Sequence, residues 1–418
     1  LRIYTYHINI VFIILILTIF PFSKLFFFLN AKVQPVSSLI TLVGLFFIKN
    51  KNSSFTYFII IGFYLLILSI ISTYFFRFND VLISLISMIL PLSTFLYLSS
   101  KNVENKYLKT TLDVGITFYI LIGAFQFFGF NAPLEILSYF YNVNTGTFGL
   151  LDYRGISFLA PEPSNSAFVI VFLFFLLYMV RNDLSKKAFF YYSCILISFI
   201  FLNKSGTLAL FVFIALLIAL LNFFILNYNF TRLLKIFFWC LALVFISIYL
   251  ISYIPKIRLF DVFNQFYIII QSGELFNTSN WYLFSGPRFI EVYAGFNEGI
   301  KSIFGNLLGS TSELFDVKLG EYDLGSYWEQ RRINGFFEES KPNSYLSFIT
   351  FEAGIIPLIV FILFTTHFFK ILLRSKNNIF IVFGVISFFM IYFRSTVTMP
   401  IAWTILGIIY YRMNNERI

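Results

Sequence analysis

A glutamate between two prolines is the first residue whose setting suggests chemistry. Glu162 stands near the end of the segment RGISFLAPEPS, which begins at Arg154 and precedes a long apolar run. Pro163 restricts the residue before it to extended conformations, and Pro161 fixes the approach, so the carboxylate is held stiffly. Ser164 is expected to cap the following helix, whose positive end favours an ionised carboxylate. Arg154 lies within reach, so Glu162 is either a functional group or half of an ion pair that fixes the helix entry.

An arginine at the start of an amphipathic helix is the second candidate. Apolar residues follow Arg288 at helical spacing, with two acidic residues off that stripe: Phe289, Tyr293, Phe296, Ile300 and Ile303, with Glu291 and Glu298. This pattern predicts a helix that lies on the outer leaflet of a membrane or packs on a helical bundle. A cation in the first turn opposes the helix dipole, and such departures are enriched at functional sites. Arg288 either binds phosphate, which suits its planar fork of donors, or pairs with Glu291 or lipid headgroups.

Weaker candidates follow along the chain. Aromatic faces and hydrogen-bond donors alternate in one short segment, at Tyr327, Trp328, Gln330, Arg331 and Arg332. This mixture suits sugar rings and phosphates, but it also suits any loop at a membrane interface. Asn343 opens the next apolar run, and Glu352 follows within it. A carboxylate inside a span is a functional candidate by default, whereas a span that begins at Ala353 would leave Glu352 at the interface.

The usual catalytic signatures are absent from the sequence. There is no GxxxxGK[ST], HExxH or GxSxG motif and no cluster of His or Cys at ligand spacing. His7 and His367 lie next to or within apolar runs, where an interfacial or packing role is expected. Cys194 and Cys240 both fall inside apolar runs and are interpreted as small buried hydrophobes. We therefore expect no metal site, no His-based triad, no disulfide and no cofactor.

The composition indicates that lipid is the main solvent of the chain. Hydrophobic residues make up 59% of the 418 positions, charged residues make up 12%, and 61 positions are Phe. The net charge of +10 does not indicate nucleic acid, because the basic residues lie between apolar runs instead of clustering on a soluble segment. The sequence predicts an all-α polytopic membrane protein with one transmembrane domain over residues 1–418.

About twelve apolar runs are long enough, or nearly long enough, to cross a bilayer. They are 8–29, 36–48, 55–76, 81–99, 112–130, 164–180, 188–202, 208–226, 233–254, 344–369, 379–393 and 396–411. The first is too long for a signal peptide core and has no small-residue cleavage site, so it is expected to remain as a span. The second is short enough to be re-entrant.

The distribution of basic residues predicts the orientation. If the N-terminus is cytoplasmic and every run crosses, cytoplasmic segments hold 16 Lys and Arg, and the short outer loops hold 6. Both termini are then cytoplasmic. Two elaborated segments fall on the outer side: a shorter periplasmic loop, 131–163, and a large periplasmic loop, 255–343, which contains the amphipathic helix.

The outer segments resemble those of the O-antigen polymerase (Wzy) family, within the larger group that includes O-antigen ligases. The resemblance rests on three motifs in order: Arg154-Gly155 leading to Glu162-Pro163-Ser164; Arg288 followed by Gly299, Gly305 and Gly309; and Asn343-Ser344-Tyr345-Leu346 followed by Gly354. They cover roughly residues 150–355, about half of the chain. Many relatives carry His before that Asn, whereas this chain has Pro342, so any proton acceptor must lie elsewhere.

The resemblance implies a glycosyltransferase of lipopolysaccharide biosynthesis in the bacterial inner membrane. Its substrate would be an undecaprenyl-diphosphate-linked oligosaccharide, transferred on the periplasmic face to the next lipid-linked unit. A chain-length regulator and a flippase are the implied pathway partners, besides membrane lipid. In our hypothesis Arg154 and Arg288 neutralise the diphosphate, and Glu162 is the general base. Arg331, Arg332 and Asn343 are further candidates for phosphate or sugar contacts.

Three other functions stay open on the sequence. An O-antigen ligase would use the same donor and move the glycan to lipid A core. A lipid-linked oligosaccharide flippase should place charges within its spans and show related halves, whereas charges within the apolar runs are scarce here and no internal repeat is evident. A non-catalytic membrane scaffold is compatible with the composition.

Overall fold

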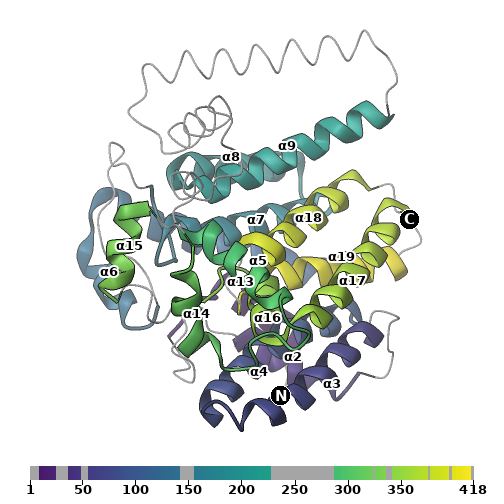
Figure 1. Ribbon diagram of the computed structural model, residues 1–418. Coiled ribbons are helices and arrows are strands. Elements are labelled where there is room, and N and C mark those ends of the chain that lie inside the picture. Colours follow the sequence, from purple (N-terminus) through teal and green to yellow (C-terminus); the bar gives the residue numbers. More distant parts are fainter. Residues whose placement is uncertain are drawn as a thin grey trace, which may run out of the picture.

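The chain folds into an assembly of α-helices (Figure 1). The computed structural model describes residues 9–24, 36–48, 55–141, 155–226, 287–322, 325–335, 341–374, 377–394 and 398–415. Four helices in these ranges are long and apolar enough to cross a membrane: α3 (Phe55–Ser72), α4 (Phe78–Ser99), α5 (Asn105–Phe128) and α17 (Ile355–Arg374). The predicted all-α class is confirmed, and these helices are typical of a membrane-embedded protein. Twelve crossings and their orientation stay predictions.

Other helices occupy most of the remaining predicted runs. They are α1 (Ile10–Ile19), α2 (Val36–Leu45), α7 (Pro163–Met179), α8 (Lys186–Asn203), α9 (Gly206–Leu226), α18 (Asn378–Phe389) and α19 (Ile401–Asn415). The run 233–254 lies outside the described residues. Helices α6 (Asn131–Ser138), α13 (Pro287–Ile300), α14 (Thr311–Leu319) and α15 (Gly325–Ile333) belong to the two predicted outer loops. In Figure 1, α13, α14 and α16 (Tyr345–Ala353) group near the centre of the view, and α15 lies to one side.

The predicted run 344–369 consists of two helices and not one. Helix α16 ends at Ala353, and α17 begins at Ile355, because Gly354 has a φ of 80°, which L side chains rarely adopt. A Cβ atom on Gly354 would lie 2.1 Å from the carbonyl oxygen of Ile303. The Tyr64 hydroxyl donates to the carbonyl of Ala353 at 2.7 Å, so this broken backbone is satisfied by a neighbouring helix.

Helix α4 lies at the centre of the packing, with α2 and α19 against it. Gly407 of α19 permits a close approach, because a Cβ there would lie 2.9 Å from Cβ of Leu98. Ser38 of α2 and Thr94 of α4 join their hydroxyl groups at 2.8 Å. Small residues and hydroxyl groups are the usual means by which helices associate in lipid, where apolar side chains gain little from leaving the solvent.

Residues predicted to share a side of the membrane contact one another. At one end, Arg412 donates to Asn105 at 2.6 Å, and Asn105 donates to Asp183 at 2.6 Å. All three belong to segments predicted to be cytoplasmic. At the other end, Lys24 donates to the carbonyl of Ser138, both predicted to be outside. The packing is therefore compatible with the orientation read from the charges.

Two smaller predictions concern the cysteines and histidines. Cys194 is exposed on α8, so the prediction that it is buried is wrong. Its helix presents apolar residues outward, Tyr191 and Ile197 among them, as expected of a surface that meets lipid. His367 is half-buried and packs with its ring centroid 5.8 Å from that of Tyr57. Cys240 and His7 lie outside the described residues.

Candidate functional site

Pro163 begins α7, and Glu162 occupies the N-cap position. Glu162 is extended, with φ −143° and ψ 151°, as its place before proline requires. The predicted cap by Ser164 is wrong, because Pro163 takes the first helical position and leaves Ser164 inside the first turn. The hydroxyl of Ser164 instead donates to Oε2 of Glu162 at 3.2 Å. The proline therefore sets both the backbone of Glu162 and the position of its neighbour.

Two buried amides hold the segment that leads to Glu162. Gln126 of α5 accepts from the backbone N–H of Phe158 at 2.8 Å and donates to its carbonyl at 3.0 Å. Asn203 at the end of α8 donates to the carbonyl of Pro163 at 3.0 Å and to the hydroxyl of Ser166 at 2.7 Å. Both amides are fully buried, where such hydrogen bonds are costly to lose. Sequence reasoning missed them, because an amide inside an apolar run gives no local signal of its partner.

Arg288 is the ion-pair partner of Glu162. Its Nη2 lies 2.7 Å from Oε2 of Glu162, and its Nη1 lies 3.4 Å from the hydroxyl of Ser164. The two side chains remain 36% and 42% exposed, so solvent weakens their mutual attraction while leaving them accessible to a ligand. The pair joins the two outer segments, which are 126 residues apart. Arg154, the partner considered from the sequence, lies outside the described residues.

Helix α13 turns its acidic face inward and its apolar stripe outward. Glu291 and Glu298 are buried, whereas Tyr293 and Ile300 are 44% and 45% exposed. The reason is a glycine-lined approach to α16: a Cβ on Gly299 would lie 2.1 Å from the carbonyl oxygen of Thr350. The sequence predicted that this helix lies on the membrane surface or packs on the helical bundle, and packing on the bundle is observed. The face that packs is the one opposite the apolar stripe.

Glu291 gathers three polar groups from three parts of the chain. Its carboxylate interacts with the charge of Arg288 on the same helix, accepts a hydrogen bond from Asn343 ahead of α16, and interacts with the charge of Arg394. Arg394 ends the π-helical turn η2 (Met390–Arg394) that continues α18. Burial raises the pKa of Glu291 to about 7, although both arginines and Asn343 act in the opposite direction. The structure thus brings Glu162, Arg288 and Asn343 to one region and adds Glu291 and Arg394.

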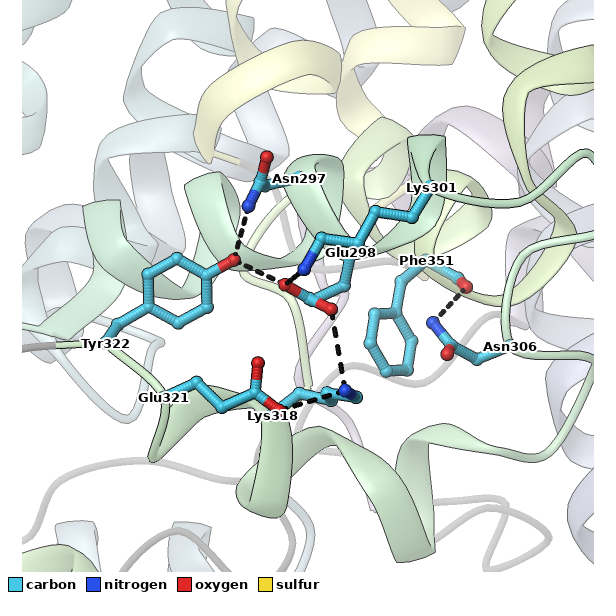
Figure 2. Close-up of polar contacts among 8 residues, drawn as sticks. All are labelled: Asn297, Glu298, Lys301, Asn306, Lys318, Glu321, Tyr322 and Phe351. Carbon is cyan, nitrogen blue, oxygen red and sulfur yellow. Dashed lines mark hydrogen bonds and ion pairs between the residues drawn. The ribbon is translucent and has the colours of Figure 1, made fainter.

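A second acidic centre lies further along α13, around Glu298 (Figure 2). Tyr322 donates to Glu298 at 2.6 Å, Lys301 contacts it at 2.5 Å, and Lys318 of α14 lies 3.8 Å away. Burial alone would raise the pKa of Glu298, but these hydrogen bonds and positive charges outweigh it and lower the pKa. Asn297 donates to the Tyr322 hydroxyl at 2.7 Å. Every group in this cluster is engaged, so we interpret it as the connection between α13 and α14.

Arg332 has a comparable structural setting. Its Nε and Nη2 donate to Glu329 at 3.0 and 2.8 Å, and its Nη1 lies 3.6 Å from Asp316 of α14. The contact with Asp316 joins α15 to α14, whereas Glu329 lies on α15 itself. Arg331 is half-buried on the same helix. In the described part of the chain, Arg332 contacts acidic residues of the loop and not the Glu162–Arg288 pair.

Glu352 is fully buried at the end of α16. Its Oε1 accepts from the backbone N–H and the hydroxyl of Thr311, at 3.2 and 2.5 Å, and from the hydroxyl of Ser84 at 3.1 Å. Its Oε2 has no hydrogen-bond partner in the described part of the chain. Glu352 therefore connects α16 to α4 and α14. The candidate span α17 begins at Ile355, so Glu352 precedes it, and the depth of Glu352 in the membrane stays a prediction.

Comparisons with known proteins give no family for this chain. No protein-family model, curated protein or solved structure matches it. The region around Glu162 and Glu291 must be interpreted from its own geometry. It combines arginine donors suited to phosphate, carboxylates suited to accepting a proton, and a position at the start of an apolar helix.

Proposed function

We propose that the protein is a glycosyltransferase that polymerises lipid-linked oligosaccharide repeat units on the outer face of a bacterial inner membrane. The donor would be a glycan on undecaprenyl diphosphate, and the acceptor a hydroxyl group of the next lipid-linked unit. The family resemblance of the sequence motivates this choice.

The ion pair between Glu162 and Arg288 is the observation that carries the proposal. The two residues were selected separately, one for its proline setting and the other for its place in an amphipathic helix. They lie on segments distant in the chain and meet at 2.7 Å. A pair that only fixed the entry of α7 would also explain this contact, so the proposal requires an effect on chemistry.

The proposed reaction assigns one role to each member of the pair. The acceptor hydroxyl oxygen attacks the anomeric carbon of the donor sugar, and the bond from that carbon to the diphosphate oxygen breaks. Arg288, together with Arg154, neutralises the negative charge that develops on the leaving diphosphate. Glu162 takes the proton of the acceptor hydroxyl. The diphosphate stays on its polyprenyl chain, so the reaction needs no nucleotide sugar.

Deletion of the gene in its host, followed by gel analysis of lipopolysaccharide, tests the proposal. A polymerase predicts loss of the long ladder with retention of core plus a single repeat unit. Complete loss of repeat units from the core would point instead to a ligase or flippase. An unchanged ladder would contradict all three functions.

Site variants then test the roles by complementation, with expression checked. Arg288→Ala and Glu162→Gln should both fail to restore the ladder. Glu313→Gln and Arg374→Ala, at exposed positions outside the site, should restore it and serve as matched controls. Full ladders from both site variants would refute the assignment.

A further inference from the structure

Helix α3 provides a scale for depth in the membrane. It is long and apolar enough to cross a bilayer, and Tyr64 lies halfway along it, before Ser72 at its end. The rise of an α-helix puts these two residues about 12 Å apart along the axis, close to half of a hydrocarbon core about 30 Å thick. Exposed apolar side chains follow the whole helix: Ile59, Ile60, Phe63, Leu66, Ile67, Ile70 and Ile71. When α3 crosses the bilayer, a group that contacts Tyr64 therefore lies near the middle of the hydrocarbon.

The chain that follows α13 reaches this depth and returns. The Tyr64 hydroxyl donates to the carbonyl oxygen of Ile303 at 3.3 Å. Further along the chain, the backbone N–H of Leu308 donates to the Ser72 hydroxyl at 2.9 Å. The segment 303–308 therefore runs alongside α3 from its middle to the end that is predicted to face the outside.

Protein groups satisfy the backbone of this segment. The backbone N–H and the side-chain amide of Asn306 both donate to the carbonyl of Phe351 in α16, at 2.9 and 3.1 Å. Gly305 has a φ of 65°, and a Cβ atom there would lie 2.5 Å from the backbone nitrogen of Gly354. Irregular backbone at membrane depth is tolerated only where protein or enclosed water meets its polar groups. The contacts with α3 and α16 meet that condition.

Apolar side chains of the segment point away from the protein. Ile300 at the end of α13 is 45% exposed, and Ile303 and Phe304 are 59% and 51% exposed. The contact with Tyr64 puts Ile303 at the level of Phe63, which is 66% exposed on α3. The solvent at that level of a membrane-spanning helix is hydrocarbon. The same hydrocarbon should therefore meet Ile303 and Phe304.

Lys301 is the single charged residue between positions 299 and 312. Its side chain is 55% exposed, and its amine contacts Glu298 at 2.5 Å, in the cluster that joins α13 to α14 (Figure 2). Long Lys side chains can keep an apolar stem in lipid while the charge lies elsewhere. The ion pair compensates the charge, so Lys301 is compatible with hydrocarbon on the neighbouring side of the segment.

We propose that residues 300–308 form a re-entrant turn in the outer half of the bilayer, with Ile300, Ile303 and Phe304 in contact with the acyl chains of lipids. The turn anchors the end of α13 in the membrane and so restrains the candidate site at the start of the same helix. The predicted periplasmic loop 255–343 would then lie partly within the bilayer. This placement does not depend on the enzymatic activity proposed above.

Spin labels on single cysteines test the placement in the full-length protein, reconstituted into vesicles of phosphatidylethanolamine and phosphatidylglycerol. Cys194→Ser and Cys240→Ser provide the background, and the label is attached at Ile303→Cys. Collision with oxygen, which concentrates in hydrocarbon, is compared with collision with a water-soluble nickel complex. The nickel collision rate should be at least about tenfold lower than at Glu313→Cys, an exposed position of α14, because a polar complex enters hydrocarbon poorly. Phe63→Cys is the matched control in α3 and should give the same oxygen-to-nickel ratio as Ile303→Cys.

The two reagents together separate lipid from water and from protein. High oxygen and low nickel collision rates at Ile303→Cys are the expected result, because only hydrocarbon gives both. A nickel collision rate equal to that at Glu313→Cys would put the turn in water and overturn the proposal. Low collision rates with both reagents would mean that protein covers the turn, for example a second copy of the chain, and would overturn it as well.

Tyr64→Phe tests the contact that places the turn. Loss of the hydroxyl leaves the carbonyl of Ile303 without this donor, which favours a form of the turn that is exposed to water. The nickel collision rate at Ile303→Cys should rise about fivefold, the factor by which an unpaired buried carbonyl shifts such an equilibrium. Tyr74→Phe, at a tyrosine that is 84% exposed beyond the end of α3, is the matched control and should leave the rate unchanged. Equal rates in the two variants would contradict the role of Tyr64.

Discussion

Gly299 is the position at which one added methyl group should displace the candidate site. A Cβ atom there would lie 2.1 Å from the carbonyl oxygen of Thr350, whereas ordinary contact begins at 3.4 Å. The obstacle is the backbone of α16 and not the end of a flexible side chain. In Gly299→Ala, α13 must therefore move away by about 1.3 Å, the difference between those two distances. The same helix carries Arg288 and Glu291.

The displacement has two measurable consequences. Overpacking of this kind costs about 1 to 3 kcal/mol of stability. A shift of about 1 Å in positioning residues can reduce a reaction rate by about 100-fold. Gly299→Ala should therefore lower the midpoint of unfolding in detergent. It should also reduce the intensity of the polysaccharide ladder by a larger factor than it reduces the amount of folded protein.

Gly62→Ala is the matched control. Gly62 lies in α3 with nothing within 4 Å of its added Cβ. Replacing a helical Gly with Ala should stabilise the protein there by about 0.5 to 1 kcal/mol. Both variants gain the same helix propensity, so the difference between them isolates the approach of α13 to α16. A midpoint for Gly299→Ala equal to or above that of Gly62→Ala would refute the reasoning.

Three further predictions concern buried polar groups. Glu352→Ala should destabilise the protein by about 3 kcal/mol in detergent unfolding, because Ser84 and Thr311 lose their acceptor, whereas Glu352→Gln keeps that oxygen and should cost much less. The raised pKa of Glu291 means that the folded state holds a proton that the unfolded state releases, so stability should fall by about 1.4 kcal/mol per unit as pH rises from 4.5 to about 7. That slope, measured against Glu291→Gln over the same pH range, should be absent from the variant. Tyr345→Phe should cost about 1 to 3 kcal/mol, because it leaves a buried carbonyl of α4 without its donor at 2.7 Å; an unchanged midpoint would contradict this.

Local signals were sufficient for most of the helices and for part of the site. Long apolar runs fix helices in lipid, because the backbone must satisfy its own hydrogen bonds there. Proline restrains Glu162 through covalent geometry, so its extended conformation follows from Pro163 alone. Arg288 and Asn343 were selected by type and position, and the structure places both beside Glu291. Their roles in chemistry stay predictions.

The sequence alone did not predict the contacts between segments that are distant in the chain. Gln126 and Asn203 hold the entry to α7 from two other helices, and the charge of Arg394, at the end of η2, acts on Glu291. The break at Gly354 depends on the close approach of Ile303, which no pattern within the run 344–369 indicates. Each case requires knowledge of which helices are neighbours.

The orientation of α13 shows why an apolar stripe is a weaker guide in lipid than in water. In water, the apolar face of a helix turns inward because burial removes it from the solvent. In lipid, or at its surface, the solvent accepts that face, and close packing of small residues determines what turns inward. Gly295 and Gly299 lie on the same face as Glu291, so the glycines that meet α16 carry this carboxylate into the protein. The residues that sequence reasoning set aside as off the stripe are therefore the ones that the fold places beside Arg288 and Asn343.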